Sequence, residues 1–163
     1  MLNSANNEIL TRVGPGTAMG GLFRQFWQPA LLCEELPAPD CPPVRVRLMG
    51  ENFVAFRDSS GKVGLLDAHC PHRLAELFFG RNEEGGLRCV YHGWKFSVTG
   101  ELLDMPSEPA GSPMRCNPNI RAKAYSVHEA GGIVWAYLGP QECVPPLPQM
   151  EFMSLPAQNF YTS

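Results

Sequence analysis

Hydrophobic positions in this chain recur in short segments with a period of two. Residues 44–48, Val-Arg-Val-Arg-Leu, alternate apolar and polar side chains, as expected of a strand with one buried face. Turn residues separate this segment from further strand candidates, which are 52–57, 62–66, 88–90, 95–98, 122–128 and 133–138. Short strands at regular spacing predict an all-β fold, an antiparallel β-sandwich or small barrel.

Helical signals are confined to two places near the start and the middle of the chain. Thr17 is suited to cap a short helix that runs to Trp27, and Pro29 would stop it. Residues 74–79 resemble a single helical turn. Residues 1–16 are polar and rich in glycine, and we expect them to form a lead-in arm.

The last part of the chain differs from the rest because prolines interrupt it. Five of them follow Gly139, at positions 140, 145, 146, 148 and 156. This spacing predicts an extended connector towards a further domain, with an ordered strap over the domain's own surface as the alternative. The expected organisation is an N-terminal arm with a short helix, a β domain with a smaller subdomain, and a Pro-rich connector, at 1–43, 44–139 and 140–163.

Composition places the chain among ordinary globular domains. Its 163 residues are 44% hydrophobic and 18% charged, so it is long and apolar enough to bury a core. Glycine and proline, with 16 residues each, fit many tight turns. The net charge is −3 and no run of Lys or Arg occurs, which argues against nucleic-acid binding.

Neither the start of the chain nor its apolar segments indicate a membrane. The first residues lack a basic region and an apolar region, and 133–138 is too short to span a bilayer. We expect a soluble, cytoplasmic protein. Its six cysteines are then better explained by metal binding or buried thiols than by disulfides. Four of them have no ligand spacing and are expected to be small hydrophobes or surface thiols: Cys33, Cys41, Cys116 and Cys143.

The remaining two cysteines belong to a pattern with metal-ligand spacing. Cys70-x-His72 is followed, after sixteen residues, by Cys89-x-x-His92, so each segment offers one thiolate and one imidazole. A structural zinc site more often takes two ligands of one type from each segment. The mixed segments suit a two-iron cluster in which both cysteines hold one iron and both histidines the other. A β domain stapled by zinc is the alternative, and metal analysis would distinguish the two.

These residues also carry a family resemblance. Cys70-Pro-His72-Arg, followed by Cys89-Val-Tyr-His92-Gly-Trp, resembles the Rieske [2Fe-2S] motif. Residues 78–88 and 104–109 are similar to the phthalate-dioxygenase type of Rieske non-haem iron ring-hydroxylating oxygenase. The likeness runs from about residue 11 to residue 147. One departure is Leu74, where many of these oxygenases have glycine.

The resemblance and the local chemistry assign roles around the ligands. Pro71 stiffens the first segment, and Gly93 permits a tight turn beside the cluster. Tyr91 and Trp94 shield the cluster, or are ordinary core aromatics. The resemblance implies that 105–109 form a third loop over the site.

Four other residues that could contribute chemistry lie near the motif or in the strand candidates. Arg73 and Arg88 flank the ligand segments, and we expect them to pair with acidic residues or to help dock a redox partner. His69 precedes Cys70 but is outside the matched pattern, so we expect a surface imidazole. His128 falls in a strand candidate and is expected to be structural.

The resemblance implies an electron-transfer function. In such oxygenases the Rieske domain passes electrons to a mononuclear Fe(II) in a C-terminal domain, where O₂ is used to hydroxylate an aromatic acid. A flavin and iron–sulfur reductase supplies electrons from NADH, and the subunits typically form trimers. Only His69 and His128 remain after the ligands, so we expect no catalytic residues and no facial triad in this chain. A free-standing Rieske ferredoxin is the alternative.

The resemblance also predicts the reduction potential. Respiratory Rieske centres add a disulfide between the ligand loops and two hydroxyl donors beside the sulfurs. Alignment on the ligands places the disulfide positions at Ala75 and Tyr91, and the hydroxyl positions at Trp94 and Phe96. Without these donors the reduced cluster is less stabilised, so we expect a midpoint at the low end of the Rieske range, about −150 to −100 mV.

Overall fold

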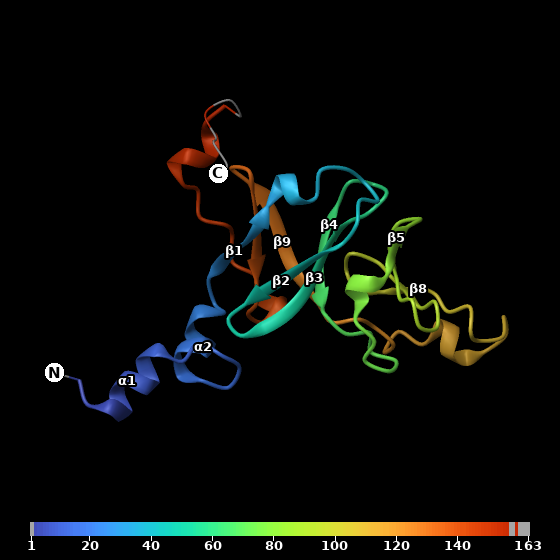
Figure 1. The fold of residues 1–163 in the computed structure, drawn as a ribbon, viewed down its shortest axis with the longest axis horizontal. Helices are drawn as coiled ribbons and strands as arrows, with labels where there is room; N and C mark the ends of the chain where they lie inside the picture. Colours follow the sequence, from blue (N-terminus) through green and yellow to red (C-terminus); the bar gives the residue numbers. More distant parts are fainter. Residues whose placement is uncertain (1, 157–158, 160–163) are drawn as a thin grey trace.

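The structure is a computed structural model that describes residues 2–156 and residue 159. Two short helices, α1 (Ser4–Thr11) and α2 (Ala18–Phe23), precede a body made of antiparallel strands (Figure 1). The expected all-β class is therefore confirmed.

The larger of two sheets has six strands in the order β1-β10-β9-β4-β3-β2. Their bounds are β1 Trp27–Leu32, β2 Val44–Leu48, β3 Glu51–Arg57, β4 Val63–Asp67, β9 Ala124–Ala130 and β10 Ile133–Tyr137. All neighbouring pairs are antiparallel. The two edge strands, β1 and β2, also contact each other, so the sheet curls towards a small barrel.

The smaller sheet lies within a long insertion between two paired strands. β4 pairs directly with β9, with Leu65 opposite Tyr125, so the whole segment between these strands leaves the larger sheet and returns to it. Within it, β5 (Arg81–Glu83), β6 (Gly86–Arg88), β7 (Lys95–Phe96) and β8 (Leu102–Asp104) form a four-stranded sheet. This smaller subdomain lies beside the β3–β4 part of the larger sheet (Figure 1).

β3 is buried on both faces and links two hydrophobic cores. Phe53 and Ala55 point into the core of the curled sheet, whereas Val54 and Phe56 pack into a second core shared with the subdomain. All four side chains are at most 1% exposed. Burial of a side chain of this size stabilises a fold by roughly 1.5–3 kcal/mol, so the second core holds the subdomain firmly against the sheet.

The helix α2, which the sequence predicts to run from Thr17 to Trp27, is shorter than expected. Thr17 caps it as expected, accepting a hydrogen bond from the Gly20 amide at 3.1 Å, but α2 ends at Phe23 and Trp27 starts β1 instead. Trp27 pairs with Tyr137, and the register shifts just after Pro29. Pro29 therefore lies in an edge strand at a bulge, where a missing amide is tolerated, rather than ending a helix.

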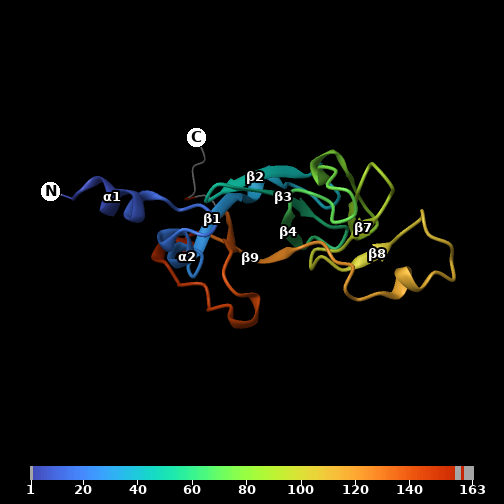
Figure 2. The same cartoon turned by 90° about the horizontal axis from the view of Figure 1, so that it is seen from below.

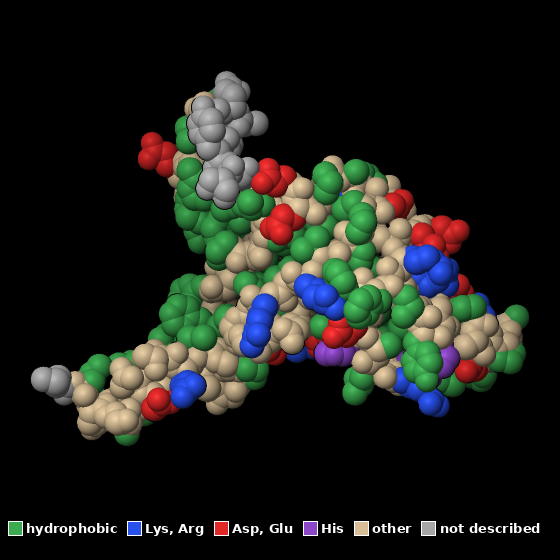
Figure 3. All heavy atoms as spheres, viewed as in Figure 1, with side chains coloured by type: hydrophobic (Ala, Val, Ile, Leu, Met, Phe, Trp, Pro, Cys, Tyr) green, Lys and Arg blue, Asp and Glu red, His purple; other side chains and the backbone are tan. Residues whose placement is uncertain are grey.

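Local structure differs from the expectation at three other places. Residues 74–79 contain only a 3₁₀ turn at Leu77–Phe79. The strand expected at 88–90 ends at Arg88, because the chain turns at Cys89. The lead-in arm contains α1, which Asn3 caps and which buries none of its side chains. This arm projects from the body of the molecule (Figure 3).

The described part of the C-terminal segment lies along the larger sheet. Trp27 Nε1 donates to the Pro145 carbonyl at 2.9 Å, and Leu147 is buried. The Phe152 ring, in the 3₁₀ turn Glu151–Ser154, lies against Gly131 in the turn between β9 and β10. Residues 157–158 and 160–163 lie outside the described residues. Among the helices of the described residues, none has the length and apolar character needed to cross a bilayer.

Candidate metal centre

Two loops of the subdomain have the same hydrogen-bonding pattern. In the first, the Cys70 amide donates to the Ala75 carbonyl at 2.8 Å, and the Leu74 amide donates back to the Cys70 carbonyl at 2.9 Å. In the second, the Cys89 amide donates to the Trp94 carbonyl at 2.9 Å, and the Gly93 amide donates to the Cys89 carbonyl at 3.1 Å. Each loop therefore closes on its own cysteine over the same number of residues.

The repeated pattern places one left-handed residue in each loop. The fourth residue after each cysteine has a positive φ, +56° at Leu74 and +74° at Gly93. Glycine adopts this conformation freely, whereas a leucine there is strained. The departure noted in the sequence at Leu74 thus leaves the shape of the first loop intact, at a cost in backbone energy.

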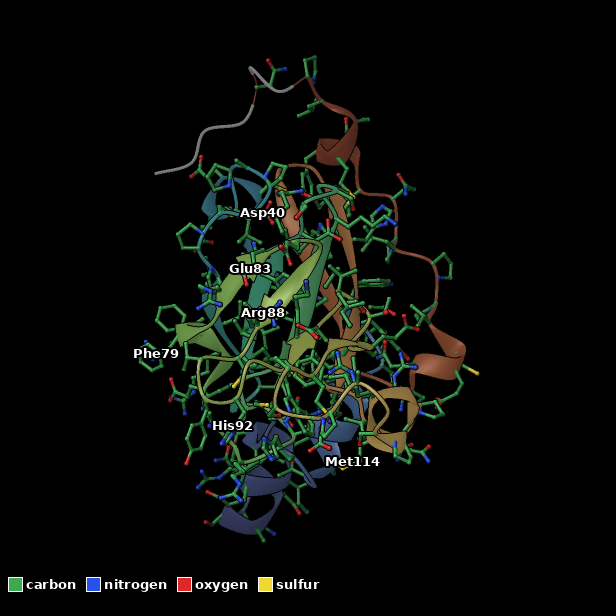
Figure 4. The ribbon with its side chains drawn as sticks, turned by 90° about the vertical axis from the view of Figure 1, so that its right-hand side faces the viewer. Asp40, Phe79, Glu83, Arg88, His92 and Met114 are labelled. Carbon is green, nitrogen blue, oxygen red and sulfur yellow. The ribbon has the colours of Figure 1, made fainter. Side chains whose placement is uncertain are left out.

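The loops bring the four candidate ligands together at one small cavity. Cys70, His72, Cys89 and His92 all line it. The two cysteines are 2% and 3% exposed and their thiols contact each other, while the ring centroids of the two histidines are 4.6 Å apart. In Figure 4, which views the molecule from the side of the small sheet, His92 lies below Arg88.

The electrostatics of the cavity suit soft metal ligands. Burial, with a smaller contribution from Cys89, raises the pKa of Cys70 to about 11, so the metal-free thiol is neutral. Burial also lowers the pKa of His72, and the nearby His92 and Arg73 act in the same direction, which favours the neutral imidazole that metals bind. Metal binding at this site would therefore release protons from the cysteines.

Two further observations test whether these residues fit an iron–sulfur cluster. His72 Nδ1 is buried and has no hydrogen-bond partner among the described residues, as expected of a nitrogen reserved for a metal. Within the same described part of the chain, no three His, Cys, Asp or Glu side chains are grouped to hold a single ion. A thiol pair beside an imidazole pair fits a two-iron cluster better than a tetrahedral zinc site.

Trp94 and a third loop cover one side of the cavity. The Trp94 ring is stacked on the His72 ring, with centroids 4.3 Å apart and an interplanar angle of 3°, and it is 5% exposed. Its Nε1 donates to Ser107 Oγ at 3.2 Å. The ring centroids of Tyr91 and His92 are 3.9 Å apart, but Tyr91 is 58% exposed. Trp94 therefore shields the site, whereas Tyr91 borders it on the solvent side.

Arg88 ties the second loop to the third. Its guanidinium bonds Glu83 at 2.7 Å and Asp104 at 2.8 Å, so the expected pairing with acidic residues is confirmed. Arg73, in contrast, is exposed on the first loop. The ion pair between Asp104 and Arg115 beside the site was not predicted from the sequence. An ion pair formed across a loop has no local sequence pattern.

The other histidines and cysteines lie outside the cavity. His69 pairs with Glu76 across the base of the first loop, and the His128 ring contacts the Trp27 ring edge-on at 6.5 Å. The other three described cysteines are half-buried or exposed: Cys33, Cys41 and Cys143. Burial, reinforced by Glu129, raises the pKa of Cys33 to about 11. The Cys116 side chain lies outside the described part of the structure.

Together, these features define an antiparallel β protein whose inserted subdomain presents two thiols and two imidazoles from paired loops. The family model of the Rieske [2Fe-2S] domain matches residues 26–126. That range covers more than half of the chain and includes all four candidate ligands. The chain belongs to the Rieske [2Fe-2S] domain family, whose cofactor is a [2Fe-2S] cluster.

Similar curated proteins are oxygenase subunits. The chain is 51% identical over 156 residues to the 3-chlorobenzoate-3,4-dioxygenase oxygenase subunit of Comamonas testosteroni, covering 96% of this chain and 35% of that protein. It is 50% identical to the phthalate 4,5-dioxygenase oxygenase subunit of Pseudomonas putida, covering 89% of this chain and 33% of that protein. The chain thus spans about a third of the length of these relatives.

Solved structures of Rieske oxygenases share the fold. Dicamba monooxygenase with non-haem iron and dicamba matches with a TM-score of 0.68 at 27% identity, over 78% of this chain and 38% of that one. The oxygenase in a complex with ferredoxin, from carbazole 1,9a-dioxygenase, matches with a TM-score of 0.67 at 29% identity, over 85% and 33%. The Rieske-type architecture expected from the sequence is therefore confirmed.

Proposed function

We propose that Cys70, His72, Cys89 and His92 hold the [2Fe-2S] cluster, with both thiolates on one iron and both imidazoles on the other. The observation that carries this assignment is the pairing of thiol with thiol and imidazole with imidazole at one cavity, from two loops of the same build. When bound, the cluster accepts and releases one electron at a time.

The surrounding residues prepare the site for that exchange. Trp94 keeps the His72 ring in one orientation and excludes water from one side. Gly93 leaves room for the third loop, because a Cβ there would lie 2.6 Å from Pro106 Cγ. Pro71 restricts the backbone between the two ligands of the first loop. The imidazoles lie nearer to solvent than the cysteines, which makes them the natural path for electrons.

We further propose that the chain is the electron-transfer domain of an aromatic ring-hydroxylating oxygenase. Support comes from the oxygenase subunits to which it is similar over most of its length. A free-standing ferredoxin is disfavoured, because the likeness to oxygenases includes the arm before β2 and part of the segment after β10. The electron donor would be a flavin and iron–sulfur reductase, the assembly a homotrimer, and the substrate an aromatic acid bound by a catalytic domain.

Anaerobic reduction by such a reductase tests this function. The cluster-loaded chain, mixed with reductase and NADH, should lose its visible absorption as it takes up one electron. With O₂ and phthalate added, it should form no hydroxylated product, since the mononuclear iron is supplied elsewhere. A His92→Ala variant, which should lack a normal cluster, is the control for reduction. Stoichiometric cis-diol formation by the chain, or failure to accept electrons, would contradict the proposal.

A further inference from the structure

Three charged residues outside the candidate ligand set join the second ligand loop to the third loop. Arg88 immediately precedes Cys89, and its Nη1 donates both to the Gly93 carbonyl and to Asp104 Oδ2, each at 2.8 Å. Arg88 therefore spans the two ends of the loop that carries Cys89 and His92. Its side chain is 13% exposed, so water competes little for these bonds. In Figure 4, Arg88 lies between Glu83 and His92.

Asp104 also bonds Arg115, which extends the network to a third residue. The second carboxylate oxygen of Asp104 accepts from Arg115 Nη2 at 3.2 Å. Arg115 Nη1 in turn donates to the Met105 carbonyl at 3.0 Å and to the Glu108 carbonyl at 2.8 Å. Arg115 thus fastens both ends of the segment 105–108 from outside. Figure 2 shows the segment around and after β8 projecting from the body, where such a fastening is needed.

The segment that Arg115 holds contacts the ligand loops directly. Ser107 accepts the indole hydrogen bond of Trp94, and Pro106 lies where a side chain on Gly93 would have to go. Met105 is 1% exposed in the core beneath the site. Movement of this segment would release Trp94, and with it the flat stacking that fixes the His72 ring.

We propose that Arg88, Asp104 and Arg115 are positioning residues that hold the second and third loops together and thereby fix the His72 imidazole through Trp94. This inference rests on the proposed ligand set, and the network that it describes consists of protein groups alone. The hydrogen bonds of the three residues reach Gly93 and the segment 105–108, so all three act on His72 through Gly93, Ser107 and Trp94.

Hydrogen–deuterium exchange and electron paramagnetic resonance together test the proposal. In Asp104→Asn and Arg115→Met, backbone exchange in residues 88–97 should rise about tenfold, because the amides of Cys89 and Gly93 lose their closed loop. The reduced cluster of both variants should give a broadened spectrum with altered g values. Arg115→Lys, which can still donate to a loop carbonyl, should restore exchange to within about threefold of the unsubstituted protein.

Two controls separate positioning from a loss of general stability. Glu101→Gln removes the same type of charge from an exposed pair with Arg121 at 3.8 Å, and should change neither readout. Leu147→Ala weakens the fold away from the loops and should leave the spectrum unchanged. Unaltered exchange and g values in Asp104→Asn and Arg115→Met would overturn the inference.

Exchange can be measured on the metal-free chain, so a variant that loads no cluster still gives a decisive result. Faster exchange in 88–97 supports the inference, and unchanged exchange rejects it. Failure of the ligand assignment itself would appear differently, as an unsubstituted protein without two irons and labile sulfide.

Discussion

At the scale of single residues, Leu74 and Gly93 show how one backbone requirement is met in two ways. Both are the fourth residue after a ligand-loop cysteine, and both adopt a left-handed conformation. Gly93 has no alternative, because any side chain would strike Pro106. The Leu74 side chain is 72% exposed and has room, so the strain of its left-handed backbone is the only cost of having a side chain at this position.

Leu74→Gly should therefore stabilise the protein. Removal of a strained left-handed leucine should raise the free energy of unfolding by about 1 kcal/mol, after allowance for the greater freedom of glycine in the unfolded chain. Urea denaturation measures the change. The matched control is Leu22→Gly on the exposed face of α2, which should cost about 1 kcal/mol instead. A destabilised Leu74→Gly variant would show that the side chain has a packing role.

The ligand assignment makes the sharpest prediction at this scale. Cys70→Ser, His72→Ala, Cys89→Ser and His92→Ala should each abolish the normal cluster, seen as loss of the brown colour and of the signal of the reduced protein in electron paramagnetic resonance. His69→Ala removes an imidazole next to Cys70 and should leave two irons and two sulfides per chain. A Cys70→Ser or His92→Ala protein with an unchanged spectrum and full iron content would refute the assignment.

The candidate ligands were predictable from the sequence because their spacing is a local property. Cys70 and His72, like Cys89 and His92, lie within one short loop, and the loops are closed by their own backbone bonds. The supporting contacts were not predictable in the same way. Arg115 reaches Asp104 across a loop of irregular backbone, and such a contact cannot be predicted from the periodicity of the sequence.

At the scale of elements, short apolar segments bounded by turn residues predicted several strands well, whether one face or both faces are buried. Residues 44–48 became β2 without a change of bounds, and 52–57 and 133–138 each match a strand to within one residue at either end. The helix expected from Thr17 to Trp27 was wrong over its second half. A capping residue and a later proline favoured a longer helix in the sequence. In the structure Trp27 instead pairs with Tyr137 and belongs to β1. That pairing joins residues far apart in the chain.

One ion pair fastens the ends of two strands and predicts a pH dependence. Arg57, at the end of β3, bonds both carboxylate oxygens of Glu129 in β9, at 2.6 and 3.1 Å, and also donates to the Leu36 and Gly61 carbonyls. The bond from Arg57 is the main reason why the pKa of Glu129 lies below its ordinary 4.5. The ionised carboxylate therefore stabilises the fold above pH 4.5, and this contribution is lost as the pH falls through the folded-state pKa.

Glu129→Gln should lower the free energy of unfolding by about 1 kcal/mol near neutral pH, a modest value because water partly screens the pair. Chemical denaturation at about pH 7 and about pH 3 should show the difference from the unsubstituted protein shrinking in acid. Glu8→Gln, in the exposed pair with Arg12 on α1, should have almost no effect at either pH. A difference that grows in acid would contradict the assigned role of Glu129.

At the scale of the whole molecule, the metal centre is built on an insertion that a shared core holds in place. β3 contributes one face to each core, so the subdomain is packed against the larger sheet rather than tethered by loops alone. The cysteines lie deep, next to that second core, and the imidazoles lie towards solvent. This arrangement suits an electron carrier that exchanges with partners through its histidine side.

The reduction potential tests the account most directly, because it separates oxygenase-type from respiratory-type Rieske centres. Ala75 and Tyr91 cannot form the respiratory disulfide, and Trp94 and Phe96 offer no hydroxyl to the cluster sulfurs. The Trp94 indole N–H is already donated to Ser107. With fewer donors to stabilise the reduced state, protein-film voltammetry at neutral pH should give a midpoint of about −150 to −100 mV. A midpoint above about +100 mV would place the centre among high-potential Rieske clusters and contradict the proposed role in an oxygenase.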